Sequence, residues 1–279
     1  MNVGEIIKNS LRYPFSDWKK ILILGFIIVV SEITSYLQLG ATNNVLIVFS
    51  VVLVLIAGFL VDGYTFRIIK SSLEDIDKLP EFNKWQAMLT DGFKVFIVFL
   101  AYVTLPLVII LSLMPIALGI DFSMLEQYYS SLLDSNLINP LLFFTSEILT
   151  GLQNILIISN DQFPIILFYF ILIIPIFFVA VANMAYEGKF KDAFRLLEII
   201  NILRDIGLIK LIKWYALTIM VFLILYFIGF AVSYILFLLN IETAGIILNL
   251  ILIPIIYIFF GRTIALIYLP EELDETQEN

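Results

Sequence analysis

The 279-residue sequence contains neither cysteine nor histidine. The absence of cysteine excludes disulfides, thiolate nucleophiles and cysteine-ligated zinc or iron–sulfur sites. The absence of histidine excludes imidazole metal ligands, histidine-dependent catalytic triads and histidine proton relays. Carboxylate, lysine, arginine, tyrosine and hydroxyl groups remain, but they form no recognisable catalytic or metal-binding motif. We therefore expect no enzymatic activity, no cofactor and no bound metal.

Charged residues are scarce, at 14% of the chain compared with about 25% in an average soluble domain. Hydrophobic residues make up 61% of the chain, and the mean hydropathy is +1.03. The net charge of −8 lacks the basic excess that is typical of nucleic-acid-binding proteins. The composition therefore predicts an integral membrane protein that contacts membrane lipids and does not bind nucleic acid.

Apolar runs long enough to cross about 30 Å of hydrocarbon, at about 1.5 Å per helical residue, recur along the chain. They cover residues 21–39, 45–66, 95–118, 163–186, 214–239 and 246–269. Because no segment is left for a separate soluble domain, the sequence predicts one integral membrane domain over residues 1–279. The expected fold class is all-α, a polytopic bundle of six transmembrane helices with additional interfacial amphipathic helices.

Lysine and arginine are concentrated in the N-terminal segment and in every second connection between these runs. Fifteen of the sixteen basic residues lie in segments 1–20, 63–94 and 187–213. The alternate connections contain none; they are residues 40–44, 119–162 and 240–244. Because basic residues are retained on the cytoplasmic side of short loops, we expect a cell-membrane protein with both termini, including the acidic tail at 270–279, in the cytoplasm.

A seventh crossing over residues 140–158 is the main alternative topology. It would place the basic segment 187–213 outside, and it would bury Glu147, Gln153 and Asn154 in hydrocarbon. We therefore expect an amphipathic or re-entrant helix on the outer face instead of a crossing.

Two cytoplasmic segments have the pattern of interfacial helices. In residues 189–204, apolar side chains recur at helical spacing and basic side chains share another face. In residues 80–94, Pro80 is expected to start a helix, with Trp85 and Phe93 as headgroup anchors. Packing beneath the bundle is an equally good interpretation of both segments.

Three ionisable residues fall inside predicted spans, where each costs about 2.5 to 3.5 kcal/mol on insertion scales: Glu32, Asp62 and Arg262. Asp62 and Arg262 lie 17 and 16 residues into runs that cross in the same direction, so we predict an ion pair between them. Separate snorkelling to the interface is the alternative. Glu32 is a candidate proton or cation site, or a carboxyl group that hydrogen-bonds between helices.

Several short patches combine aromatic, acidic, glycine and basic residues near the ends of the predicted helices. They are Tyr13 to Lys20, Asp62-Gly63-Tyr64 with Arg67, Leu79 to Phe82 with Trp85, Asp91-Gly92, Tyr186-Glu187-Gly188 with Ala193-Phe194, and Gly261-Arg262. Taken in order, these patches resemble an archaeal membrane family known only as domain of unknown function 4013. The resemblance implies a multi-pass membrane protein and assigns no activity, substrate or cofactor.

Three functions are compatible with the sequence. The first, which we expect, is a non-enzymatic membrane component that binds lipids, a protein partner or a second copy of itself. The second is a transporter or permease for a small solute or ion, using Glu32 and helices broken by proline. The third is a lipid-modifying enzyme; Asp62-Gly63 with Arg67 resembles the start of the Asp-Gly-x-x-Ala-Arg motif of phospholipid head-group transferases, but the rest of that motif is missing.

Overall fold

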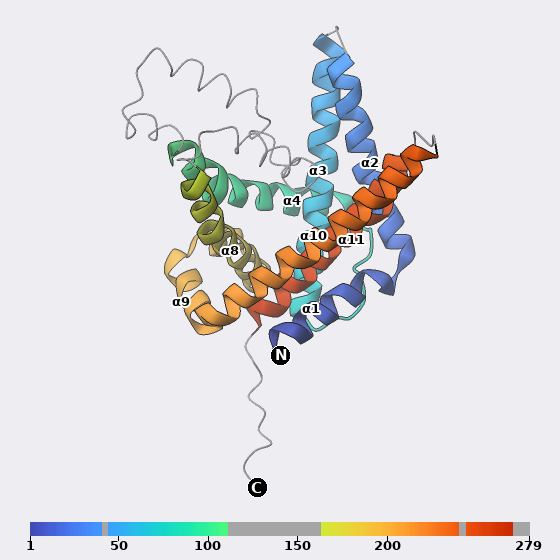
Figure 1. Ribbon diagram of the computed structural model, residues 1–279. Coiled ribbons are helices and arrows are strands. Elements are labelled where there is room, and N and C mark those ends of the chain that lie inside the picture. Colours follow the sequence, from blue (N-terminus) through green and yellow to red (C-terminus); the bar gives the residue numbers. More distant parts are fainter. Residues whose placement is uncertain (41–43, 111–162, 240–243, 270–279) are drawn as a thin grey trace. The chain divides into compact units, whose positions relative to one another are not determined.

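In the computed structural model, the described part of the chain forms helices joined by short loops and contains no strand (Figure 1), so the prediction of an all-α fold is confirmed there. The described residues are 1–40, 44–110, 163–239 and 244–269. The predicted outer segment 119–162, the alternative crossing at 140–158 and the acidic tail lie outside them.

The chain divides into two compact units, one of Met1–Val95 with Val179–Asn279 and one of Phe96–Phe178. One integral membrane domain over residues 1–279 stays a prediction. The first unit holds, in order, α1 (Val3–Arg12), η1 (Tyr13–Ser16), α2 (Trp18–Gly40), α3 (Asn44–Leu73), the start of α4 (Trp85–Phe99), the end of α8 (Phe163–Glu187), η4 (Phe190–Phe194), α9 (Leu196–Ile206), α10 (Leu208–Leu238) and α11 (Ala244–Tyr268).

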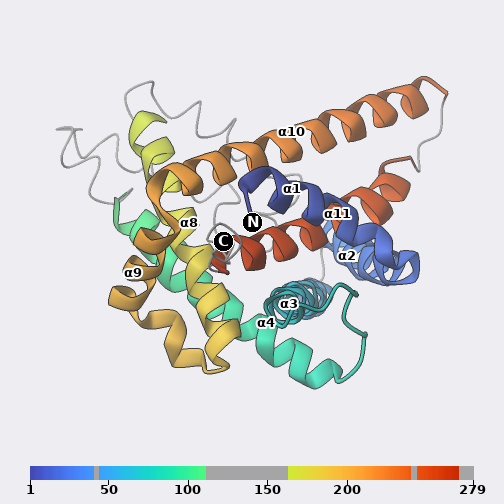
Figure 2. The same cartoon turned by 90° about the horizontal axis from the view of Figure 1, so that it is seen from below.

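The N-terminal helix α1 is amphipathic and packs against the other helices. A capping box starts it: the Glu5 N–H donates to the Asn2 side chain at 2.9 Å, and the Asn2 N–H donates to the Glu5 carboxylate at 3.0 Å. Its apolar residues Ile6 and Ile7 are buried. α1 lies across α11 (Figure 2), so the two ends of the described sequence meet in one core.

Helices of the first unit approach so closely that three positions, Gly25, Gly63 and Gly92, admit only glycine. α2 and α3 lie side by side, and both contact α11. A Cβ atom on Gly25 of α2 would overlap the backbone carbonyl of Leu250 in α11, and one on Gly92 of α4 would overlap the carbonyl of Phe59 in α3. Because a helix backbone cannot move aside as a flexible side chain does, these glycines fix the spacing of the helices.

Among the described residues, four helices are long and apolar enough to cross a membrane: Val45–Leu73, Trp85–Ile110, Leu208–Leu236 and Leu250–Tyr268. A shorter apolar helix covers Ile171–Glu187. The predicted run at 21–39 falls within α2, which is also helical throughout. Length and composition are thus compatible with a membrane protein, and the number of six crossings stays a prediction.

The described part of the third apolar run, residues 95–110 of the predicted 95–118, is the later part of a longer helix. That helix begins at Trp85 and is apolar enough to span as far as Ile110. Its early turns carry polar residues that pair with one another: the Lys94 ammonium donates a hydrogen bond to an Asp91 carboxylate oxygen at 2.9 Å. A search for apolar runs omits such turns although they are helical, so the predicted start is wrong by ten residues.

The segment 189–204, predicted as one amphipathic helix, is two helices. η4 is a 3-10 helix, and α9 begins after Arg195, whose ψ of 72° interrupts the helical path. The 3.6-residue spacing of apolar residues continues across this break, which is why the sequence pattern alone does not reveal it.

In the second unit, η2 (Leu100–Thr104) is a π-helical turn. Such a turn shifts the backbone hydrogen-bond register, so its carbonyls gain from outside donors. The Tyr169 hydroxyl of α8 donates to the Tyr102 carbonyl at 3.2 Å and to the Val103 carbonyl. α8 therefore stabilises the distorted turn.

Two prolines that fall inside predicted spans, Pro175 and Pro254, do not break their helices. Pro175 lies inside α8 and Pro254 lies inside α11, and both helices continue through them. At these two positions the structure has continuous helix where the transporter interpretation expected a break.

Candidate functional site

The loop of residues 76–84 joins α3 to α4 and contains no helix or strand, so the predicted helix start at Pro80 is wrong. α3 ends in a Schellman motif: the Ile76 N–H donates to the Ser71 carbonyl at 2.9 Å, and residue 75 has a φ of 56°. Past this motif the loop carbonyls have no regular backbone ladder. They need side-chain donors, because a buried carbonyl without one costs about 1–3 kcal/mol.

Arg262 of α11 binds the start of the loop, although only 1% of its surface is exposed. Its Nη1 donates to the Ile76 carbonyl at 3.3 Å, and its Nη2 pairs with the Asp77 carboxylate at 2.5 Å. Its Nε donates to the Asn9 side chain of α1 at 3.1 Å, and the guanidinium lies 4.7 Å from the centroid of the Tyr13 ring. A lysine ammonium cannot reproduce this planar set of contacts.

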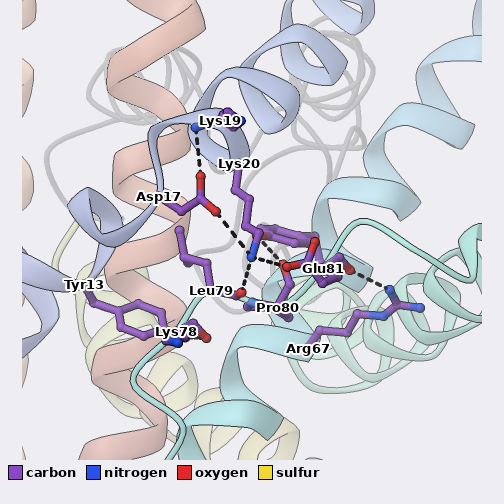
Figure 3. Close-up of polar contacts among 10 residues, drawn as sticks. Tyr13, Asp17, Lys19, Lys20, Arg67, Lys78, Leu79, Pro80 and Glu81 are labelled. Carbon is purple, nitrogen blue, oxygen red and sulfur yellow. Dashed lines mark hydrogen bonds and ion pairs between the residues drawn. The ribbon is translucent and has the colours of Figure 1, made fainter.

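Lys20 of α2 binds the middle of the loop (Figure 3). Its Nζ donates to the Leu79 carbonyl at 2.7 Å and to the Glu81 carboxylate at 2.8 Å. A further carboxylate, Asp17, lies 3.4 Å from the same Nζ. The ammonium therefore sits among three oxygens of its own protein, with its side chain only 11% exposed.

Two tyrosine hydroxyls bind further carbonyls of the loop. The Tyr13 hydroxyl donates to the Lys78 carbonyl at 2.9 Å, and the Tyr64 hydroxyl of α3 donates to the Pro80 carbonyl at 3.0 Å. The Tyr64 ring also stacks on Phe82, with centroids 4.0 Å apart. Each tyrosine thus buries its ring and uses its polar end to hold the backbone.

Arg67, one helical turn beyond Tyr64, binds the end of the loop. Its Nη2 donates to the Lys84 carbonyl at 2.9 Å, and its Nη1 donates to the Asn83 carbonyl at 2.5 Å. The side chains that donate hydrogen bonds to the loop carbonyls come from η1, α2, α3 and α11. The loop therefore links these four elements.

The three cations at this site find their acceptors within the protein. Lys20 meets the carboxylates of Asp17 and Glu81, and Arg262 meets the carboxylate of Asp77. Arg67 donates to backbone carbonyls of the loop. The cations are directed at the protein's own oxygens, so the arrangement can hold the loop in one conformation. In the described part of the chain, no group of three or more acidic side chains is placed to hold a metal ion.

The predicted ion pair between Asp62 and Arg262 is wrong, because Arg262 pairs with Asp77. The prediction matched depths from the starts of the apolar runs. In the structure, Gly261 packs beside Ile68, six residues past Asp62, which is about 9 Å along a helix. Arg262 therefore lies at the level of the α3 terminus and reaches the loop beyond it.

The other two ionisable candidates are not part of this site. Asp62 is half-buried on α3, and the described residues provide it with no ion-pair partner. Glu32 lies on α2, and its side chain falls outside the described part. Their functional roles stay predictions.

A second polar contact joins α8, η4 and α11. Fully buried Asn183 donates to the Asp192 backbone carbonyl at 3.0 Å and accepts from the Tyr268 hydroxyl at 2.8 Å. The buried Asp192 carboxylate lies 3.1 Å from the Arg195 Nε. The hydrogen bond from Arg195 to Glu198, followed by the charge of Asp192, raises the pKa of Arg195 above its ordinary value. Arg195 is thus fixed as a cation at the start of α9.

Sequence reasoning identified Arg262 but missed the other donors to the loop. The usable signal was the gathering of tyrosine and basic residues at helix ends next to one irregular segment. The sequence patches that carry the family resemblance meet here: residues 13–20, 62–67, 79–85 and 261–262 supply the loop or the side chains that bind it.

Comparisons with known proteins agree with that resemblance. An uncharacterized protein of Methanocaldococcus jannaschii is 27% identical over 110 residues, which cover 31% of this chain and 39% of that protein. No solved structure matches. The sequence model of the family described as "Protein of unknown function (DUF4013)" matches residues 45–234, including the 76–84 loop with Tyr64 and Arg67. Because this match covers more than half of the chain, the protein belongs to the DUF4013 family.

Proposed function

We propose that the protein is a multi-pass membrane protein that works by binding and not by catalysis. In this proposal six helices cross the membrane, both termini are cytoplasmic, and the protein holds membrane lipids or a protein partner. The observation that carries the proposal is the 76–84 loop. Its cations are occupied by the protein's own carbonyls and carboxylates, which suits a fixed framework better than a reactive centre.

The arrangement of the first unit also supports the proposed orientation. Lys20 and Arg67 come from two different basic segments of the sequence, and both bind the same loop. The third basic segment includes α9, which contacts α11, the helix that carries Arg262. A common location of the three segments is what the positive-inside rule requires of cytoplasmic connections.

Native mass spectrometry of protein extracted gently from its own membrane tests the binding role. We expect a stoichiometric protein partner, or a defined set of phospholipids, to remain bound. A lone protomer that retains a defined small solute and no lipid would contradict the proposal and favour transport.

Transport is the second candidate, and Asp62 is the observation that favours it. A carboxylate on an apolar helix, with no ion-pair partner among the described residues, is a common feature of ion and proton pathways. If the protein is a transporter, a substrate should raise the unfolding temperature of the wild type and not that of Asp62→Asn. Thr65→Val is the matched control on α3, because that hydroxyl bonds only to its own helix at Val61.

A further inference from the structure

The short helix α9 has apolar side chains on two faces. α9 contacts α10 and α11, and its residue Ile199 is fully buried. Ile200 and Leu197 lie about 100° and 160° round the helix from Ile199, with Leu196 beside Ile200, and the three are 53%, 81% and 53% exposed. Packing of α9 against α10 and α11 therefore buries the face that carries Ile199 and leaves the other apolar face exposed.

η4 extends the exposed face. Phe190 and Phe194 are 38% and 40% exposed, and their rings pack edge to face with centroids 5.3 Å apart. Together they form what we call the α9 patch: Phe190, Phe194, Leu196, Leu197 and Ile200. Fully burying one such side chain stabilises a protein by about 1.5–3 kcal/mol. An exposed apolar patch of this kind therefore marks a surface that binds a partner or a membrane.

The patch lies next to a membrane-spanning candidate. A single residue, Gly207 with a φ of 84°, separates α9 from α10. The apolar span Leu208–Leu236 begins there, and its first residues Leu208 and Ile209 are 70% and 71% exposed. The bilayer that receives this span is therefore the nearest apolar phase to the patch.

The charges around the patch complement lipid phosphate. Arg204 follows Ile200 by four residues and Leu197 by seven, so it lies on the patch face of α9. Asp205 lies about 100° further round the helix, on the flank. Lys189 and Lys191, at the start of η4, are also exposed. Apolar side chains bordered by basic ones are typical of helices that lie in a membrane interface.

We propose that the α9 patch inserts into the headgroup region of the cytoplasmic leaflet, where Arg204 binds lipid phosphate. This inference rests on the proposed membrane-embedded, lipid-binding role and names the surface and the ligand class. The patch then fixes the depth of α10 by holding its first turn at the interface.

Spin labelling tests the insertion, because the native chain has no cysteine. Leu197→Cys and, as the flank control, Asp205→Cys are labelled in the full-length protein in phospholipid nanodiscs. We expect the ratio of oxygen to nickel-chelate collisions to be several-fold higher at position 197 than at position 205. Arg204→Gln should lower that ratio at position 197, and the charge control Asp205→Asn should leave it unchanged.

Equal, water-like ratios at both positions would overturn the proposal and would leave the patch for a soluble partner. Dipolar broadening at position 197 in nanodiscs that hold two copies would also overturn it, because a second copy would then cover the patch. If either result is obtained while native mass spectrometry still finds bound phospholipid, only the assignment of the α9 patch fails. If no lipid or partner is found either, the proposed function fails as well.

Discussion

At the scale of single residues, Arg262 joins α11 to α1, η1 and the 76–84 loop. Burying a guanidinium is costly unless each of its donors finds an oxygen, and here the carbonyl, amide and carboxylate oxygens are supplied by residues far apart in the sequence. The loop is thereby bound to the last described helix, so its conformation depends on the whole first unit being assembled.

Replacing Arg262 with methionine should destabilise the protein strongly. The oxygens of Asn9 and Ile76 lose their donor, at a cost of about 1–3 kcal/mol for each oxygen that stays buried. Asp77→Asn should cost at most about 1 kcal/mol, because the Asp77 side chain is 78% exposed and can be hydrated. Thermal unfolding of both variants in nanodiscs measures the difference. Similar losses in the two variants would mean that the ion pair, and not the buried donor set, carries the stability.

At this scale the sequence predicts that a buried cation needs hydrogen-bond or ion-pair partners. It does not predict which residues those partners are. A buried arginine in an apolar run must be satisfied, and this much was predictable. The identity of Asp77 was not, because it depends on how far α3 extends beyond its apolar run and how the loop folds back. The same applies to Tyr13 and Tyr64, whose acceptors are the backbone carbonyls of Lys78 and Pro80. A backbone carbonyl has no signal in the sequence.

At the scale of helices, backbone contact at glycine sets the packing. Gly25 lies against the carbonyl of Leu250, and Gly92 lies against the carbonyl of Phe59. By contrast, Gly229 of α10 faces only the flexible end of the Leu252 side chain. An alanine methyl group would therefore overlap a backbone carbonyl at Gly25 and Gly92, but at Gly229 it would meet only a side chain that can move.

Gly25→Ala should force α2 and α11 apart and lower stability by about 1–3 kcal/mol, the usual cost of overpacking. Gly229→Ala should be near neutral, because the Leu252 methyl can rotate away and alanine has the higher helix propensity. Unfolding temperatures in the same lipid environment compare them. The packing account would be contradicted by an equal or larger loss in Gly229→Ala.

Helix positions were largely predictable from the sequence, and helix ends were not. Each described helix that is long and apolar enough to cross a membrane overlaps a predicted run, because about 20 apolar residues have few alternatives to a helix. The ends extend past the runs into polar turns, as at Trp85 and Leu208. The break at Arg195 was unpredictable for the converse reason, since the periodicity runs through it.

At the scale of the whole molecule, the central claim is the orientation of the chain in the membrane. The sequence predicts that the basic segments share one side of the membrane, and in the structure residues of two of them, Lys20 and Arg67, bind the 76–84 loop. The claim fixes which side of the membrane the α9 patch faces. It also decides whether residues 140–158 cross the membrane, since one additional crossing would invert everything that follows.

Cysteine labelling tests this claim most directly, because each introduced cysteine is unique in the chain. Asn43→Cys, Asn136→Cys and Asn201→Cys are treated with a membrane-impermeant thiol reagent in intact cells. Labelling of positions 43 and 136 without permeabilisation, and of position 201 only after it, is the result that six crossings with cytoplasmic termini predict. Labelling of Asn201→Cys in intact cells would contradict the account and would place α9 and its patch outside.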